Sequence, residues 1–105
     1  MAVFDPILKD FRAALDAVYG ERLDRVVLFG SRARGDARPD SDYDVAVFLK
    51  AYQGDRWVES DTISTVAARF LRSHDALIHA MPYRAEQYDE RSPLMYEIRG
   101  EGLAL

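Results

Sequence analysis

Two aspartates, Asp42 and Asp44, begin one apolar run, and a Gly30–Ser31 pair ends the apolar run before it, with ten residues between Ser31 and Asp42. Magnesium is usually held by one or two carboxylates together with substrate phosphates and water. A glycine lets phosphates approach the backbone, and a serine donates to them from its hydroxyl and its amide. We therefore predict a nucleoside triphosphate site in which Gly30 and Ser31 bind phosphate, while Asp42 and Asp44 bind the metal and are catalytic.

Arginines are concentrated around this stretch. Of the 14 basic residues most are arginine, and five of these lie in or next to the stretch: Arg22, Arg25, Arg32, Arg34 and Arg38. A guanidinium can hold two phosphate oxygens at once. We expect Arg32 and Arg34 to neutralise the departing pyrophosphate, and Ser41 to orient the metal-binding carboxylates by hydrogen bonds from outside. For any one arginine taken alone, a purely solubilising role is the simpler interpretation.

Composition limits the class of protein. At 105 residues and 49% hydrophobic, we expect residues 1–105 to form a single domain. The absence of cysteine excludes disulfides and thiolate zinc sites, and the net charge of −4 argues against direct nucleic-acid binding. Without a long apolar run or a leader-like amino terminus, we expect a soluble cytoplasmic protein with no membrane association.

Periodic apolar residues predict the elements that hold these side chains in place. Spacings of three and four, with Asp5 as cap and Pro6 in the first position, predict a helix over 5–19 that ends at Gly20. The run 25–29 lacks polar alternation, which indicates a strand buried on both faces. Residues 30–35 predict a turn into a short helix, and 36–41 a loop.

The run 42–49 is predicted to be a strand on which Asp42 and Asp44 share a face. Successive side chains of a strand point to opposite faces, so these two carboxylates lie on one side with α-carbons about 7 Å apart. That spacing lets both reach one ion.

Further elements follow the strand. We predict a helix over 56–72 with Trp57 as a core or interface anchor, and a strand over 76–81 closed by Pro82. A short helix is expected from the cap Ser92 until Gly100 stops it. The final residues 103–105 add a short strand or dock an end.

The segments Gly-Ser-Arg-Ala-Arg-Gly (30–35) and Ser-Asp-Tyr-Asp-Val-Ala-Val (41–47) resemble the signature of the polymerase-beta-like nucleotidyltransferase superfamily, and more narrowly the minimal nucleotidyltransferase (MNT) domains. The resemblance implies an α/β (α+β) fold, a mixed β-sheet flanked by helices. It also implies Mg²⁺ as cofactor, ATP as donor, and transfer of AMP to a hydroxyl. In that family the acceptor is a tyrosine of a HEPN ribonuclease toxin, which the MNT protein neutralises as its antitoxin.

One position departs from the family pattern. The superfamily often places a third carboxylate on the later strand, where this chain has His79, and Asp75 is expected about 13 Å away along the same face. His79 is either a general base, a weak metal ligand, or a polar residue with no role in catalysis. The alternative to an enzyme is therefore an antitoxin that acts by complex formation alone; transfer to RNA or to a small molecule ranks last.

Overall fold

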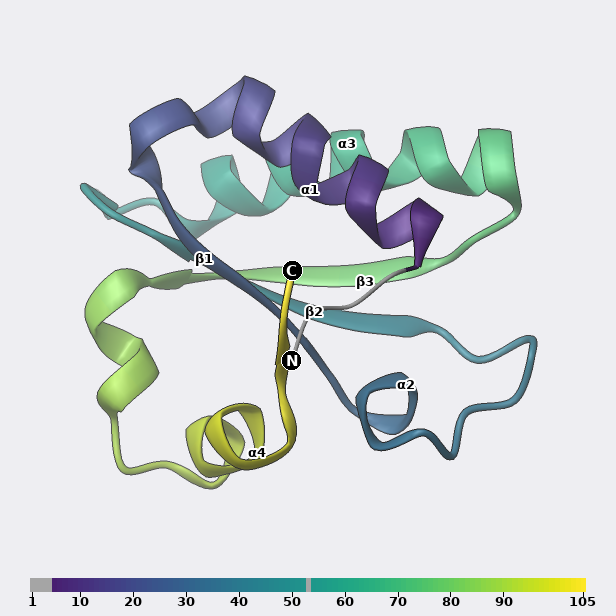
Figure 1. Ribbon diagram of the computed structural model, residues 1–105. Coiled ribbons are helices and arrows are strands. Elements are labelled where there is room, and N and C mark those ends of the chain that lie inside the picture. The colour runs from purple at the N-terminus through teal and green to yellow at the C-terminus, as the bar shows by residue number, and fades with distance from the viewer. Residues whose placement is uncertain (1–4, 53) are drawn as a thin grey trace.

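The computed structural model describes residues 5–52 and 54–105, which fold into helices packed on one mixed sheet (Figure 1). In chain order the elements are α1 (Pro6–Tyr19), η1 (Gly20–Arg22), β1 (Leu23–Phe29), α2 (Ser31–Arg34), β2 (Tyr43–Leu49), α3 (Arg56–His74), β3 (Ile78–Arg84), η2 (Ala85–Asp89), α4 (Pro93–Glu101) and β4 (Leu103–Ala104). The strand order is β3-β2-β1-β4.

The sheet is mixed because its central strands pair differently with their neighbours. β1 is antiparallel to both β2 and β4, whereas β2 and β3 are parallel and are joined through α3. A parallel connection needs a long crossover, which the 19 residues of α3 provide. The predicted α/β class with a mixed sheet is confirmed, and so is the short strand expected near the carboxyl end.

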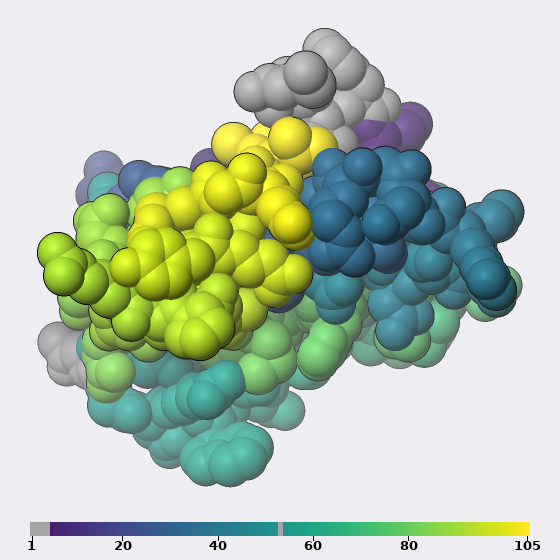
Figure 2. Space-filling view, turned by 90° about the horizontal axis from the view of Figure 1, so that it is seen from below, coloured from purple at the N-terminus to yellow at the C-terminus, as the bar shows by residue number. Residues whose placement is uncertain are grey.

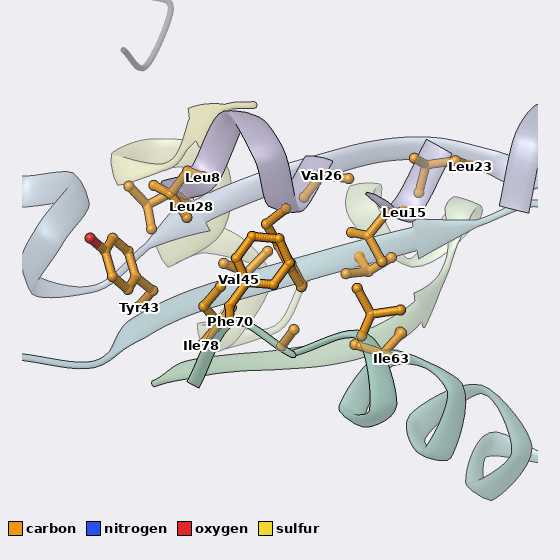
Figure 3. Packing of buried hydrophobic residues seen from close by; sticks show 14 of the residues in the cluster. Leu8, Leu15, Leu23, Val26, Leu28, Tyr43, Val45, Ile63, Phe70 and Ile78 are labelled. Carbon is orange, nitrogen blue, oxygen red and sulfur yellow. The ribbon is translucent and has the colours of Figure 1, made fainter. Parts of the chain in front are cut away.

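α1 and α3 cover one face of the sheet and form the larger core with it (Figures 1 and 3). Phe11 of α1 and Phe70 of α3 meet edge to face with ring centroids 5.5 Å apart. From β2 this core takes alternate residues: Tyr43, Val45, Val47 and Leu49. The intervening residues of β2 therefore point to the other face, as the period of two predicts.

α4 covers part of that second face. Met95 and Ile98 pack on Val27 of β1 and on Ala46 and Phe48 of β2 to form a smaller core. Asp44, one step earlier on the same face of β2, is outside this cluster. The second face is thus packed at one end of β2, and its aspartate end borders α2.

The helix start signals are confirmed, but α4 does not stop where expected. Asp5 Oδ1 accepts the Ile7 amide at 2.9 Å, and Ser92 Oγ accepts the Met95 amide at 3.2 Å. α4 continues through Gly100 and is capped at Gly102, whose amide donates to Ile98 O at 2.9 Å. An interior glycine costs a helix only about 1 kcal/mol, so Gly100 alone does not end it.

Pro82 lies inside β3, so the prediction that it closes the strand was wrong. The strand runs over Ile78–Arg84, and Pro82 stands in register with Val47 of β2. β3 is an outer strand of the sheet, where a residue without an amide hydrogen is tolerated on the side that faces away from the ladder. Asp75 was also misplaced: it caps α3 in a left-handed conformation and is not on the strand.

Trp57 is 80% exposed, so of its two predicted roles the place in the core was wrong, and the role of interface anchor stays a prediction. α3 reaches the sheet through a stripe that begins only at Ile63, and the tryptophan lies in the first turn before it. Three other residues expected on apolar stripes are also exposed: Val18, Val58 and Leu71. Among the described residues, no helix combines the length and the apolar character that a membrane span requires.

Candidate active site

The turn after β1 is built around Gly30. This residue is buried, caps α2, and has φ 74° and ψ −156°, a region of backbone space that is essentially restricted to glycine. Its carbonyl accepts the amides of Ala33 and Arg34, both at 3.1 Å, which bends the chain directly from β1 into α2. Ser31 follows as the first residue of that short helix and is half-buried.

Asp44 lies directly against this turn. A Cβ added to Gly30 would come within 2.5 Å of Asp44 Oδ2 and within 3.3 Å of its Cγ. The strand register explains the contact, because Asp44 pairs with Phe29, the residue before the glycine. Two residues 14 positions apart in the sequence are therefore adjacent in space, and the carboxylate fills the space that a side chain at Gly30 would need.

Asp42 lies one residue before β2 and is exposed. The chain is already extended there, since the Tyr43 amide donates to Leu77 O of the segment leading into β3 at 2.9 Å. Asp42 borders a cavity of about 550 Å³ that is also lined by Arg32 and Ser41. Asp44 is not among the residues that line this cavity.

Arg32 is held within the protein. Its Nε and Nη2 donate to Ser41 O at 2.9 and 2.7 Å, and Nη2 also donates to Pro39 O at 3.1 Å. Its guanidinium stacks on the Tyr43 ring, 4.0 Å from the centroid. These contacts hold the loop 36–41 against the start of β2. They engage the Arg32 guanidinium, which thus acts as a clamp that fixes the position of that loop.

Arg34 connects α2 to α4. Its Nη1 lies 3.2 Å from Glu101 Oε2 and 3.6 Å from Glu97 Oε1, and its Nε lies 3.3 Å from Asp36 Oδ2. Hydrogen bonds to Glu101 and then to Asp36 raise the pKa of Arg34 above its usual value. Figure 2 shows this face, with the carboxyl-terminal residues and those around α2 side by side. Asp36 is a neighbour in the sequence, but nothing near residue 34 indicates the two glutamate partners.

Ser41 accepts a hydrogen bond at the end of the loop. Its Oγ takes the Arg38 amide at 2.9 Å, which closes a local turn. Within the described residues this is the only hydrogen bond that the Ser41 side chain makes, and it serves the loop.

A contact network that the sequence did not reveal anchors the first residue of β2. The Tyr43 hydroxyl donates to Asp5 Oδ2 at 2.9 Å, and the same carboxylate caps α1 through its other oxygen. Burial, and then the bond to Asp5, raise the pKa of Tyr43 above its ordinary value. Tyr43, which lies between the two aspartates in the sequence, is thus fixed to α1. Its position between Asp42 and Asp44 was the only sequence feature that pointed to a structural role at the site.

His79 occupies the position beside Asp44 on the neighbouring strand. The two residues pair in the parallel register of β2 and β3, and His79 Nδ1 lies 3.7 Å from Asp44 Oδ1. The histidine side chain is 66% exposed and the aspartate 35%. The structure thus brings together Gly30, Asp44 and His79.

Comparison with known proteins decides the family. The sequence model described as Nucleotidyltransferase domain matches residues 8–95. The chain belongs to this nucleotidyltransferase family. It is therefore a nucleotidyltransferase, which confirms the prediction made from the aspartates and the Gly-Ser pair.

Two curated relatives of this nucleotidyltransferase come from Methanocaldococcus jannaschii. One, provisionally named protein adenylyltransferase MJ0141, is 36% identical over 78 residues, which are 74% of this chain and 77% of the relative. The other, provisionally named protein adenylyltransferase MJ0604, is 30% identical over 84 residues, 80% of this chain and 77% of the relative.

Solved structures show the same fold. A protein of Sulfolobus solfataricus, provisionally described as a nucleotidyltransferase, matches 93% of this chain and 75% of its own at a TM-score of 0.66 and 20% identity. A chain of a toxin–antitoxin complex with AMP-PNP matches 91% of this chain and 70% of its own at 0.61 and 20% identity. The fold of this nucleotidyltransferase is the polymerase-beta-like one, as the resemblance implied.

The donor atoms at this site fit magnesium. Asp42 and Asp44 offer hard carboxylate oxygens, while residues 5–52 and 54–105 contain no group of three or more His, Cys, Asp or Glu placed to hold a metal by themselves. A magnesium ion that takes its remaining ligands from phosphates and water needs no such group. Gly30 keeps the turn in contact with Asp44, so phosphates bound at Ser31 would lie beside this carboxylate.

Proposed function

We propose that this nucleotidyltransferase transfers AMP from ATP to a tyrosine hydroxyl of a HEPN-type toxin and thereby acts as its antitoxin. The observation that carries the proposal is the contact of the Gly30 turn with the Asp44 carboxylate. In our proposal this contact joins a phosphate-binding turn and a metal-binding acid in one site. The names of the two Methanocaldococcus relatives support protein as the acceptor.

Support for a toxin partner comes from the structural neighbours. One toxin–antitoxin complex holds AMP-PNP, an ATP analogue. Another, MntA–HpeT, carries two aspartate-to-glutamate substitutions two residues apart, the spacing of Asp42 and Asp44 here. Its matched chain shares 18% identity with this one at a TM-score of 0.60. We extend the role of antitoxin to this protein on that likeness.

The reaction is an in-line displacement at the α-phosphorus of ATP. The phenolic oxygen forms a bond to this phosphorus, the bond to the bridging oxygen of the β-phosphate breaks, and pyrophosphate leaves with those electrons. In our proposal Ser31 binds the phosphates, Asp42 and Asp44 hold Mg²⁺, and His79 is placed to take the phenolic proton. When bound, the metal neutralises charge on the phosphates and aligns the attacking and leaving oxygens.

The test is transfer of label from α-labelled ATP to the protein encoded by the neighbouring reading frame. We expect Asp42→Asn with Asp44→Asn to lower the labelling rate at least about 1,000-fold, which is about 4 kcal/mol of barrier. Asp10→Asn, an exposed carboxylate on α1, is the matched control and should label normally. Full labelling by the double variant would refute the proposal.

A second candidate is an antitoxin that neutralises its partner by complex formation alone. It is favoured by His79 at the place of the usual third carboxylate and by the engagement of Arg32 with the loop it clamps. The same double variant separates the two candidates in cells that express the toxin. Protection that survives the loss of both aspartates supports the second candidate, whereas loss of protection with the complex intact supports the enzyme.

A further inference from the structure

We propose that the outer edge of β3, together with the groove between β3 and α3, binds an extended segment of the acceptor protein. This segment presents a tyrosine to the face of the sheet that carries Asp44 and His79. The inference rests on the proposed function and adds to it the surface on which the acceptor docks.

The outer backbone groups of β3 are open to pairing. Leu77 O accepts the Tyr43 amide, so the backbone of residue 77 faces β2. In a parallel pair the backbone groups of successive residues alternate between the two sides of a strand. Those of Ile78 and Ala80 therefore point outward, where residues 5–52 and 54–105 contribute no further strand.

Pro82 sets the length of this open edge. By the same alternation it faces outward, the side on which its missing amide hydrogen breaks no bond to β2. An incoming strand can pair with Ile78 and Ala80 but finds no donor at residue 82. So short an edge suits the transient contact of a substrate and is too small for the buried area of a stable homodimer.

A groove of about 420 Å³ runs beside this edge. Its α3 side is made largely of small residues, and its β3 side is the edge itself: Ser60, Ser64, Ala67, Ala68 and Leu71 face Leu77, Ile78, His79, Ala80 and Met81. Leu71 and Leu77 are 45% and 50% exposed. The small residues leave room for an apolar side chain of an incoming strand, and the two leucines supply its contacts.

The groove leads to the candidate active site. Leu71 and Leu77 also line the cavity that Asp42 borders, so the two hollows share a wall. His79 lines the groove at the strand edge, and its side chain lies beside Asp44 on the other face of the sheet. A chain segment bound along β3 is thus already next to the metal-binding acids.

The alternation of side chains along a strand determines which residue of the bound acceptor segment reaches the metal-binding acids. Side chains of Ile78 and Ala80 belong to the α3 side of the sheet, as Figure 3 shows for Ile78, and His79 points to the other face. A residue opposite His79 on an added strand shares that face, about 10 Å from the Asp44 α-carbon, since neighbouring strands lie about 4.8 Å apart. Of the hydroxyl side chains only tyrosine is long enough to span most of this distance. Transfer then forms the bond from its oxygen to the α-phosphorus and releases pyrophosphate, while the phenolic proton passes to His79.

The direct test is amide hydrogen exchange on this protein, free and in complex with the protein encoded by the neighbouring reading frame, in the presence of AMP-PNP. The amides of Ile78 and Ala80 should exchange fast in the free protein and at least tenfold more slowly in the complex. A stable complex in which both amides keep their free rates would overturn the proposal. Because AMP-PNP is not turned over, the result does not depend on catalysis.

A pair of variants tests the groove. Leu71→Gln with Leu77→Gln should weaken partner binding at least tenfold, measured without nucleotide because both leucines also line the cavity that Asp42 borders. Val18→Gln with Val58→Gln, at residues 46% and 59% exposed outside the groove, should bind the partner normally. If the groove variant binds the partner as tightly as the wild type does, the docking surface is refuted, but the proposed transfer of AMP is not. Conversion of a homodimer to a monomer by that variant would instead assign the groove to a second copy of this chain.

Discussion

At the scale of single residues, the account depends on the contact between Gly30 and Asp44. The sequence pattern placed a glycine and an aspartate at the ends of two strands, and the register of β1 with β2 makes them neighbours. The contact was predictable because antiparallel pairing of consecutive strands brings the end of one beside the start of the next.

Gly30→Ala is predicted to disturb both stability and nucleotide binding. The added methyl would overlap Asp44 Oδ2 at 2.5 Å, and φ of 74° with ψ of −156° strains any other residue. We expect a loss of about 2–4 kcal/mol in the free energy of unfolding, measured by urea denaturation, and loss of AMP-PNP binding by calorimetry.

Gly35→Ala is the matched control for this change. It also has a positive φ, 84°, but a Cβ there meets nothing within 4 Å. It should cost only about 1–2 kcal/mol and keep nucleotide affinity. Equal effects of the two substitutions would show that backbone strain alone matters and that the contact with Asp44 does not.

The predicted roles of Arg32, Arg34 and Ser41 depend on side-chain partners that local sequence does not determine. Arg34 meets Glu101, 67 positions away, and Arg32 meets backbone carbonyls of a loop whose path no periodicity encodes. A residue type and its spacing can thus predict that a group lies near the site, but not which competing partner holds it.

At the scale of elements, the connection between α2 and α4 ties the phosphate-binding turn to the carboxyl-terminal helix. Helix and strand identities followed from periodicity and caps, and both long helices lie where they were predicted. Two predicted ends were wrong: at Pro82 strand pairing overrides a local break signal, and at Gly100 a single glycine is too weak to end the helix. α4 itself packs on the sheet through Met95 and Ile98, so its acidic residues are free to face α2.

Removing the acidic side of this connection is predicted to favour nucleotide binding. Glu97→Gln with Glu101→Gln releases Arg34 and removes two negative charges near the phosphates, so affinity for AMP-PNP should rise several-fold in calorimetry. The pairs are about 40% exposed, so unfolding free energy should change by less than about 1 kcal/mol. Weaker binding in this variant would show that the connection itself shapes the turn.

At the scale of the whole molecule, one end of the sheet's second face is covered by packing, and the other end carries the candidate active site. α4 and η2 cover the second face near the end of β2, while Asp44, His79 and the Gly30 turn meet at the start of that strand. Alternation along β2 predicted that the aspartates share one face of the sheet. It did not predict how far each helix covers the sheet, which is why the core was one of the two places expected for Trp57.

The most direct test of one shared nucleotide site is NMR of the ¹⁵N-labelled protein with AMP-PNP and Mn²⁺, whose unpaired electrons broaden nearby amide signals. We expect the amides of Ser31, Asp44 and His79 to broaden, and that of Arg84, about 16 Å further along β3, to stay sharp. The broadening of these three amide signals should disappear when Asp42→Asn and Asp44→Asn are combined. Broadening centred on Arg84, or unaltered in the double variant, would contradict the account.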